Sequence, residues 1–282
     1  MKFRPAFGRD ARVNALLGAG HFLSHFYQLC LPPLFIAWQQ AFDVSFAELG
    51  LVMAVMAASA AVMQTPMGFL VDRYGARPFL IGGTLLMTLA IAAMGLATAY
   101  WQIVGLSLLS GVGNSVIHPA DYAILSGSVD RAKLGRSFAF HTFVGHVGFA
   151  AAPPTTAALA LLLGWRGALL FIGLLGLPVV LAIIWQSRIL IDQVRQPRRR
   201  AVAPAVGARL LLSRSVLMFF AFFMVSSMAG AGVQSWLITI LHQAHGLDIA
   251  VASSALTGYM VGMIAGVLVG GWVADRTDRH LP

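Results

Sequence analysis

The sequence predicts an all-α membrane protein with eight transmembrane helices. Hydrophobic residues make up 59% of the 282-residue chain, charged residues make up 10%, and the mean hydropathy is +0.81. This composition is too apolar for a soluble domain. The apolar residues gather in runs of about 20, the length that crosses about 30 Å of hydrocarbon as a helix. The basic residues lie on alternate connections between these runs, as in a multi-spanning protein.

Each apolar run is expected to be helical because backbone groups in lipid have to be paired within their own segment. The period-2 alternation of barrel strands is not present. The predicted spans are residues 13–38, 47–70, 78–99, 101–125, 137–162, 167–187, 215–241 and 250–274. We therefore expect an N-terminal six-helix bundle at 1–187, a basic cytoplasmic linker with seven arginines at 188–214, and the first two helices of a second bundle at 215–282.

The positive charges predict the orientation. Of the 19 Lys and Arg residues, 18 fall on one side of the predicted membrane, and only Arg166 falls on the other. The positive-inside rule then makes the N-terminus cytoplasmic. The basic start resembles a signal peptide, but the first run is long enough to span and no small-residue cleavage site follows it, so we expect a retained helix. Because the basic residues flank apolar runs, the expected partner is the lipid bilayer and not a nucleic acid.

A short motif occurs twice, 203 residues or six spans apart. Its glycines allow close approach of the chain, and its acid can pair with arginine or face a helix N-terminus. Such a repeat at corresponding positions predicts two pseudo-symmetric halves. The residues are Gly68, Asp72, Arg73, Gly75 and Arg77 after the second span, and Asp275 and Arg276 after the eighth.

Both loops resemble the cytoplasmic signature of major facilitator superfamily (MFS) transporters. The resemblance implies two bundles of six helices, alternating access, and a cytoplasmic gate formed by the residues of the repeated motif. It also implies that this chain carries helices 1–8 of twelve, as a fragment or a truncated product; a self-contained eight-helix protein is the alternative.

Two further segments resemble the fosmidomycin-resistance-like efflux branch of this superfamily. They are residues 111–121, which include Asn114, His118 and Asp121, and residues 134–154. Ser107 stands where many drug/proton antiporters have an arginine, so the resemblance does not extend to their arginine-dependent proton coupling.

Polar residues recur at helical spacing in the first, fourth and seventh spans. In a bundle of the resembled kind these helices line a central cavity, and polar groups are costly in hydrocarbon unless they face water, cargo or each other. The candidates for contact with the cargo or with protons are His21, His25, Gln28, Asn114, His118, Asp121 and Gln234. His141 and His146 are ranked lower because their spacing of five places them on different faces.

Asp121 has two open interpretations. It either takes part in proton coupling or lies near the cytoplasmic end, hydrated or paired with Arg131 or Arg136. The His21/His25 pair has the i, i+4 spacing of a zinc site, but no Glu or Cys joins it on the helix, so we predict no metal. The single cysteine, Cys30, excludes an intrachain disulfide. No cofactor and no catalytic residue is expected.

The predicted function is secondary active transport of a small organic solute or drug in a multi-pass cell membrane protein, with proton-coupled efflux as the candidate mechanism. A membrane enzyme would need a convergent catalytic constellation, and a channel would need charged rings or a filter loop; neither pattern occurs. The remaining alternatives are a non-transporting sensor or assembly subunit of the same fold and a non-functional fragment.

Overall fold

The computed structural model describes residues 8–192 and 213–274, which form helices and no strand. The all-α fold predicted from the sequence is confirmed. The first bundle comprises α1 (Arg9–Leu29), η1 (Pro32–Leu34), α2 (Phe35–Phe42), α3 (Phe46–Tyr74), α4 (Ala76–Met94), α5 (Tyr100–Ser115), α6 (Ile117–Ser128), η2 (Arg131–Lys133), α7 (Leu134–Leu174), α8 (Gly176–Trp185) and η3 (Ser187–Ile189). Two further helices follow, α10 (Arg214–His245) and α11 (Ile249–Ala274).

The first and fourth predicted spans are interrupted, and prolines explain both breaks. The first span consists of α1, η1 and α2, with Pro32 and Pro33 at the interruption. The fourth consists of α5 and α6, which meet at Val116. Pro119 follows one turn later and has no N–H to donate to the carbonyl of Ser115, so the helix cannot continue regularly through this point.

Span five lies in α7, and span six consists of the end of α7 together with α8; within α7 the two spans are divided by a kink at Gly164. That residue has φ 68° and ψ 167°, which is not helical, and it lies between the two predicted spans. Six helical segments of the described chain are long and apolar enough to cross a membrane. One of these six segments, Arg131–Trp185, contains two predicted spans, and the interrupted first span is not among the six. The six segments therefore agree with the eight predicted spans.

The helices of the first bundle pack closely where glycines face a neighbouring backbone. An added Cβ on Gly148 of α7 would lie against the carbonyl of Phe22 in α1, and one on Gly113 of α5 would lie 2.8 Å from the carbonyl oxygen of Gly83 in α4. Small residues at such positions let membrane helices approach. The positions of α1 and α5 that carry the candidate polar side chains are therefore held by backbone contact.

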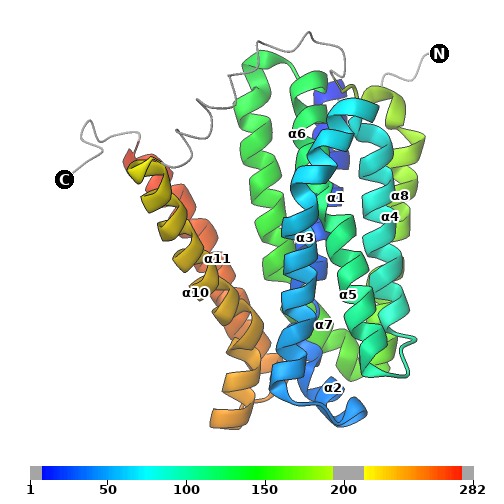
Figure 1. Ribbon diagram of the computed structural model, residues 1–282, viewed down its shortest axis with the longest axis vertical. Helices are drawn as coiled ribbons and strands as arrows, with labels where there is room; N and C mark the ends of the chain where they lie inside the picture. The colour runs from blue at the N-terminus through cyan, green and yellow to red at the C-terminus, as the bar shows by residue number, and fades with distance from the viewer. Residues whose placement is uncertain (1–7, 193–212, 275–282) are drawn as a thin grey trace.

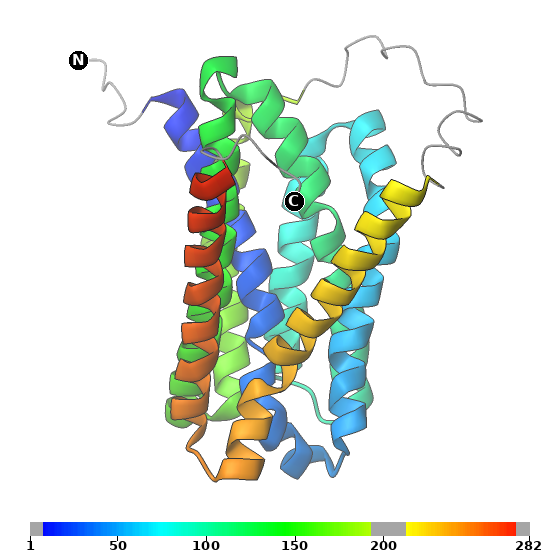
Figure 2. The same cartoon turned by 90° about the vertical axis from the view of Figure 1, so that its left-hand side faces the viewer.

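Helices α10 and α11 meet at the end of the molecule opposite the start of α1 and separate from each other toward the other end (Figure 2), where both lie away from the first bundle (Figure 1). The first half of α10 is exposed, including Phe219 and Phe223. Its second half packs through the Trp236 ring, whose centroid lies 5.4 Å from that of Phe35 and 6.1 Å from that of Phe46. The first half of α11 packs on α7, where the Thr257 hydroxyl donates to the carbonyl of Ala150 at 3.0 Å, so both helices contribute to the contact between the two parts of the chain.

Candidate functional site

A cavity of about 330 Å³ lies between α1, α3, α5 and α10. It includes three of the candidate residues, Gln28 from α1, Asn114 from α5 and Gln234 from α10. The Gln28 amide donates to the carbonyl of Ser24 at 3.1 Å, and the Asn114 amide lies 3.5 Å from the same oxygen. The structure therefore gathers neutral hydrogen-bonding groups from both parts of the chain around one space.

Most of the remaining cavity wall is apolar or small. Met53, Met56 and Ala57 of α3 contribute to it, and so does Trp236 of α10. Gly50 accommodates the Trp236 indole, since an added Cβ would lie 3.1 Å from it. A concave space with apolar walls and a few convergent polar groups is typical of a small-molecule site.

The other candidates form a separate buried cluster where α1, α6 and α7 meet. The rings of His21 and His141 are stacked with centroids 3.7 Å apart, and the His118 ring lies 5.1 Å from that of His21. Asp121 is fully buried, and its Oδ2 lies 3.6 Å from His141 Nε2. The interpretation of Asp121 as paired with Arg131 or Arg136 is therefore wrong, because the carboxylate points from α6 toward the histidines.

Several polar atoms of this cluster have no hydrogen-bond partner among the described residues. They include both carboxylate oxygens of Asp121, both ring nitrogens of His141 and Nδ1 of His118. An unpaired buried polar group costs about 1–3 kcal/mol. Such groups mark places where a protein binds something or holds water.

His25 lies at the edge of the cluster, and His146 lies outside it. The His25 ring is 4.3 Å from His21 and 4.2 Å from Phe149, centroid to centroid. His146 bonds through Nδ1 to the carbonyl of Thr142 in its own helix. Sequence reasoning ranked His141 too low, although its spacing to Gly145 and Gly148, at steps of four and three, already indicated the face of α7 that contacts α1.

The first copy of the repeated motif forms the connection between α3 and α4. Gly75 links the two helices with φ 95° and ψ 152°, a conformation essentially restricted to glycine. Asp72 and Arg73 are exposed, and the Arg73 guanidinium lies 5.2 Å from the centre of the Tyr74 ring. A Cβ added at Gly68 would have no described atom within 4 Å.

An unpredicted acid completes this connection. Asp192 accepts hydrogen bonds from the backbone N–H groups of Ala76 and Arg77, the first two residues of α4. It therefore caps a helix that has no capping side chain of its own. The second copy of the motif, Asp275 and Arg276, lies outside the described residues, as does most of the predicted linker; residues 188–192 of that linker pack on the first bundle.

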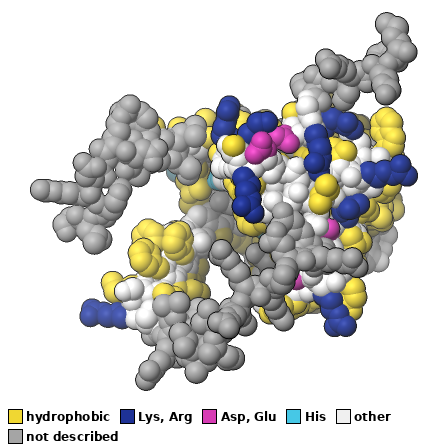
Figure 3. All heavy atoms as spheres, turned by 90° about the horizontal axis from the view of Figure 1, so that it is seen from above, with side chains coloured by type: hydrophobic (Ala, Val, Ile, Leu, Met, Phe, Trp, Pro, Cys, Tyr) yellow, Lys and Arg dark blue, Asp and Glu magenta, His cyan; other side chains and the backbone are white. Residues whose placement is uncertain are grey.

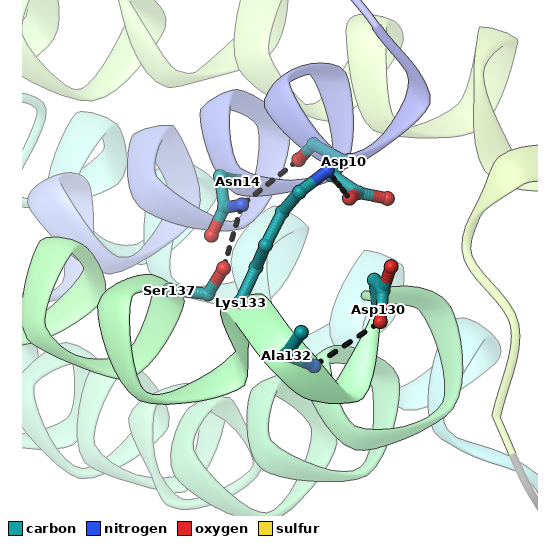
Figure 4. Close-up of polar contacts among 6 residues, drawn as sticks. All are labelled: Asp10, Asn14, Asp130, Ala132, Lys133 and Ser137. Atoms are coloured by element: carbon teal, nitrogen blue, oxygen red, sulfur yellow. Dashed lines mark hydrogen bonds and ion pairs between the residues drawn. The ribbon is translucent and has the colours of Figure 1, made fainter.

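Charged side chains gather at the end of the bundle where α1 begins (Figure 3). Lys133 pairs with Asp10 at 3.0 Å, and Asn14 bridges the Asp10 carbonyl to the Ser137 hydroxyl, which joins α1 to η2 and α7 (Figure 4). Arg12 donates to the side chain of Gln186, which joins α1 to the end of α8. Exposed ion pairs contribute little individually, so the network positions helix ends more than it stabilises the fold.

Residues 17–282 match the family model described as the Major Facilitator Superfamily. The chain belongs to this superfamily. The resemblance inferred from the repeated motif is thereby confirmed, and membership of a family of transporters supports the prediction that the chain is not an enzyme.

Known MFS proteins resemble the chain over most of its length. It is 26% identical to a probable L-galactonate transporter of Escherichia coli over 253 residues, which is 84% of this chain and 55% of that protein. It is 22% identical to the fosmidomycin resistance protein of Escherichia coli, over 99% of this chain and 68% of that protein. A solved bacterial homologue of the human lysosomal transporter Spinster, inward-facing and unoccupied, superposes with a TM-score of 0.82 at 16% identity. That likeness shows the fold alone, over 98% of this chain and 65% of the other.

The chain thus spans a little over half to about two thirds of the length of these relatives. It is a multi-pass membrane protein of the MFS fold. Within the described residues, the cavity and the buried histidine cluster are the two places where candidate polar residues meet.

Proposed function

We propose that the full-length protein is a secondary active transporter that moves a small organic solute across the cytoplasmic membrane by alternating access, and that it exports this solute in exchange for protons. The coarse part of the proposal, transport, is supported by the superfamily to which the chain belongs. The finer part, efflux, is supported by the similarity to the fosmidomycin resistance protein. An ion gradient is the energy source of a secondary transporter, and the proton gradient is the one we propose.

The cavity carries the proposal. Gln28 and Asn114 reach it from the first bundle and Gln234 reaches it from α10, so a solute bound there contacts both parts of the chain. Alternating access requires such a site, because rocking of one bundle against the other exposes it to each side in turn. Amide groups donate and accept hydrogen bonds without a charge of their own, which suits hydroxyl and carboxylate oxygens of a small organic solute.

The charged end is proposed to be cytoplasmic, in agreement with the positive-inside rule. The connection between α3 and α4, with Gly68, Asp72, Arg73, Gly75 and Arg77, would then form half of a cytoplasmic gate. Asp275 and Arg276 would form the symmetric half. In support, α10 contacts the first bundle at the opposite end, through Trp236, and diverges from it at the charged end (Figure 2).

Flux into proteoliposomes tests the proposal on the full-length protein. Labelled L-galactonate and fosmidomycin serve as probes, because similar proteins are named for these compounds. We expect uptake of at least one probe into inside-out vesicles to accelerate when the lumen is acidic, with proton release from the lumen reported by a trapped pH dye. Gln28→Leu, Asn114→Leu and Gln234→Leu should each lower flux by about tenfold, the effect of leaving one polar partner of about 1.4 kcal/mol unpaired.

Gln243→Leu provides the matched control, since Gln243 is exposed on α10, outside the cavity. Equal flux in the cavity variants and the control would show that the cavity does not hold the cargo. Saturable probe binding without flux would favour the sensor alternative. Flux that is indifferent to the proton gradient would overturn the proposed coupling while leaving transport intact.

A further inference from the structure

The buried cluster between α1, α6 and α7 has the composition of a metal site. Its side chains come from three helices: His21 from α1, His118 and Asp121 from α6, and His141 from α7. One ring nitrogen from each histidine lies within 4.8 Å of the others, and the Asp121 carboxylate adjoins the set at 3.6 Å from His141 Nε2. Three histidine nitrogens thus lie close together, with a carboxylate beside one of the three rings.

The hydrogen bond made by His21 fixes which of its nitrogens is available. Its Nδ1 lies 2.9 Å from the backbone carbonyl oxygen of His141, which can only accept, so Nδ1 carries the hydrogen and donates it. In the neutral ring, Nε2 then carries a lone pair, and this atom is buried with no hydrogen-bond partner among the described residues. A backbone carbonyl that orients one ring nitrogen is the arrangement commonly found behind metal-bound histidines.

The other donors are likewise unpartnered. Asp121 is fully buried, no described Lys or Arg forms an ion pair with it, and neither of its oxygens accepts a hydrogen bond. His141 has no hydrogen-bond partner at either ring nitrogen, and His118 has none at Nδ1. A cation at the centre would give each of these groups a partner.

We propose that His21, His118, His141 and Asp121 bind one divalent transition-metal ion, with Zn²⁺ as the best fit to the donor set. Imidazole nitrogens favour zinc and its neighbours, whereas Mg²⁺ and Ca²⁺ prefer oxygen ligands. Three nitrogens and one carboxylate oxygen supply the four ligands of a tetrahedral site. With Zn–N distances of about 2.0–2.1 Å, tetrahedral ligand atoms lie about 3.3 Å apart, so histidine nitrogens that are up to 4.8 Å apart converge by up to about 1.5 Å on binding. The stacked rings of His21 and His141 tilt at the same time, because the lone pair of each ring lies in its plane.

The packing of α7 against α1 leaves room for the His21 ring. An added Cβ on Gly145 would lie 2.6 Å from His21 Cε1 and 2.8 Å from its Nδ1. Glycine at this position is therefore what allows the ring to reach the centre of the cluster. The ion would join α1 to α6 and α7, and since all four ligands lie in the first bundle, the proposal is independent of the proposed transport function.

Zinc binding to the full chain tests the proposal. The chain is purified in detergent with a tag that contains no histidine, stripped with a chelator, and titrated with Zn²⁺ in competition with a chromophoric indicator. We expect one zinc ion per chain, retained through gel filtration and not displaced by Mg²⁺ or Ca²⁺. Co²⁺ in its place should show the intense visible absorption of a four-coordinate site.

The variants separate ligation from folding. His118→Ala, His141→Ala and Asp121→Asn should each lower the zinc affinity by at least about 10- to 100-fold, the range seen when even an outer partner of a ligand is removed. Gly145→Ala, which removes no donor, should weaken binding by displacing the His21 ring. His146→Ala is the matched control, since His146 is bonded within its own helix, and it should bind zinc as the wild type does.

Gel filtration and circular dichroism show which variants fold. If the histidine variants do not fold, Asp121→Asn still tests the proposal, because asparagine has nearly the same shape as aspartate. A wild-type chain that retains no zinc would overturn the proposal and leave the cluster as a hydrated polar core. Wild-type affinity in folded Asp121→Asn and His118→Ala chains would overturn it equally, because the bound zinc would then lie elsewhere.

Discussion

Substitution of Gly75 by alanine should destabilise the protein, because the connection between α3 and α4 requires a backbone conformation that side chains disfavour. Gly75 has φ 95° and ψ 152°. A residue with a Cβ in this region costs about 1–3 kcal/mol. The turn cannot easily relax, since the N–H of Gly75 donates to Val71 O at 2.8 Å and the next N–H donates to Asp192.

A loss of 1–3 kcal/mol multiplies the ratio of unfolded to folded protein by roughly 5- to 150-fold. Equilibrium unfolding in mixed detergent micelles, followed by circular dichroism, measures this change. Gly68→Ala is the matched control within the same motif and should not destabilise the protein. Gly68 lies inside α3, and no described atom lies within 4 Å of an added Cβ. Alanine is moreover favoured over glycine in a helix by about 1 kcal/mol. Wild-type stability in Gly75→Ala, or an equal loss in Gly68→Ala, would refute the reasoning.

Two further predictions use the same unfolding measurement. Gly83→Ala should lower the free energy of unfolding by about 1–3 kcal/mol, because the added Cβ would lie 2.6 Å from the carbonyl oxygen of Gly113. Gly82→Ala, on the open face of the same helix, should leave this free energy unchanged or raise it slightly. Similar results for the two variants would contradict the packing of α4 on α5. Asp192→Ala should cost about 0.5–2 kcal/mol by removing the cap of α4, and Asp192→Asn, which keeps an acceptor, should cost less; no loss in Asp192→Ala would show that the cap is dispensable.

Helix placement could be predicted because it depends on local properties of the chain. Apolar length, the alternation of basic connections and the prolines are all read along the sequence, and the eight spans correspond to the observed helices. The break of the fourth span at Val116 was missed, although Pro119 was its signal. The close approach at Gly113 and Gly83 depends on two helices that are far apart in sequence, and only the structure shows it.

Helical periodicity also indicated which residues of one helix share a face. Gln28 in α1 and Asn114 in α5 were selected in this way, and both line the cavity. Their roles remain predictions until flux is measured. Which faces meet was not determined by periodicity, because the pairing of faces depends on where neighbouring helices can approach each other.

The histidine cluster shows most clearly which features the sequence determined and which only the structure decided. The sequence by itself determined the stripe on α1 that contains His21, and it predicted no metal because a motif search considers ligands on one helix. The structure alone decided that His141, on α7, stacks on His21, and that Asp121 turns inward beside it. The physical reason is packing: Gly145 leaves the space into which the His21 ring fits, and a contact between helices so far apart in the chain leaves no periodic signal in either one.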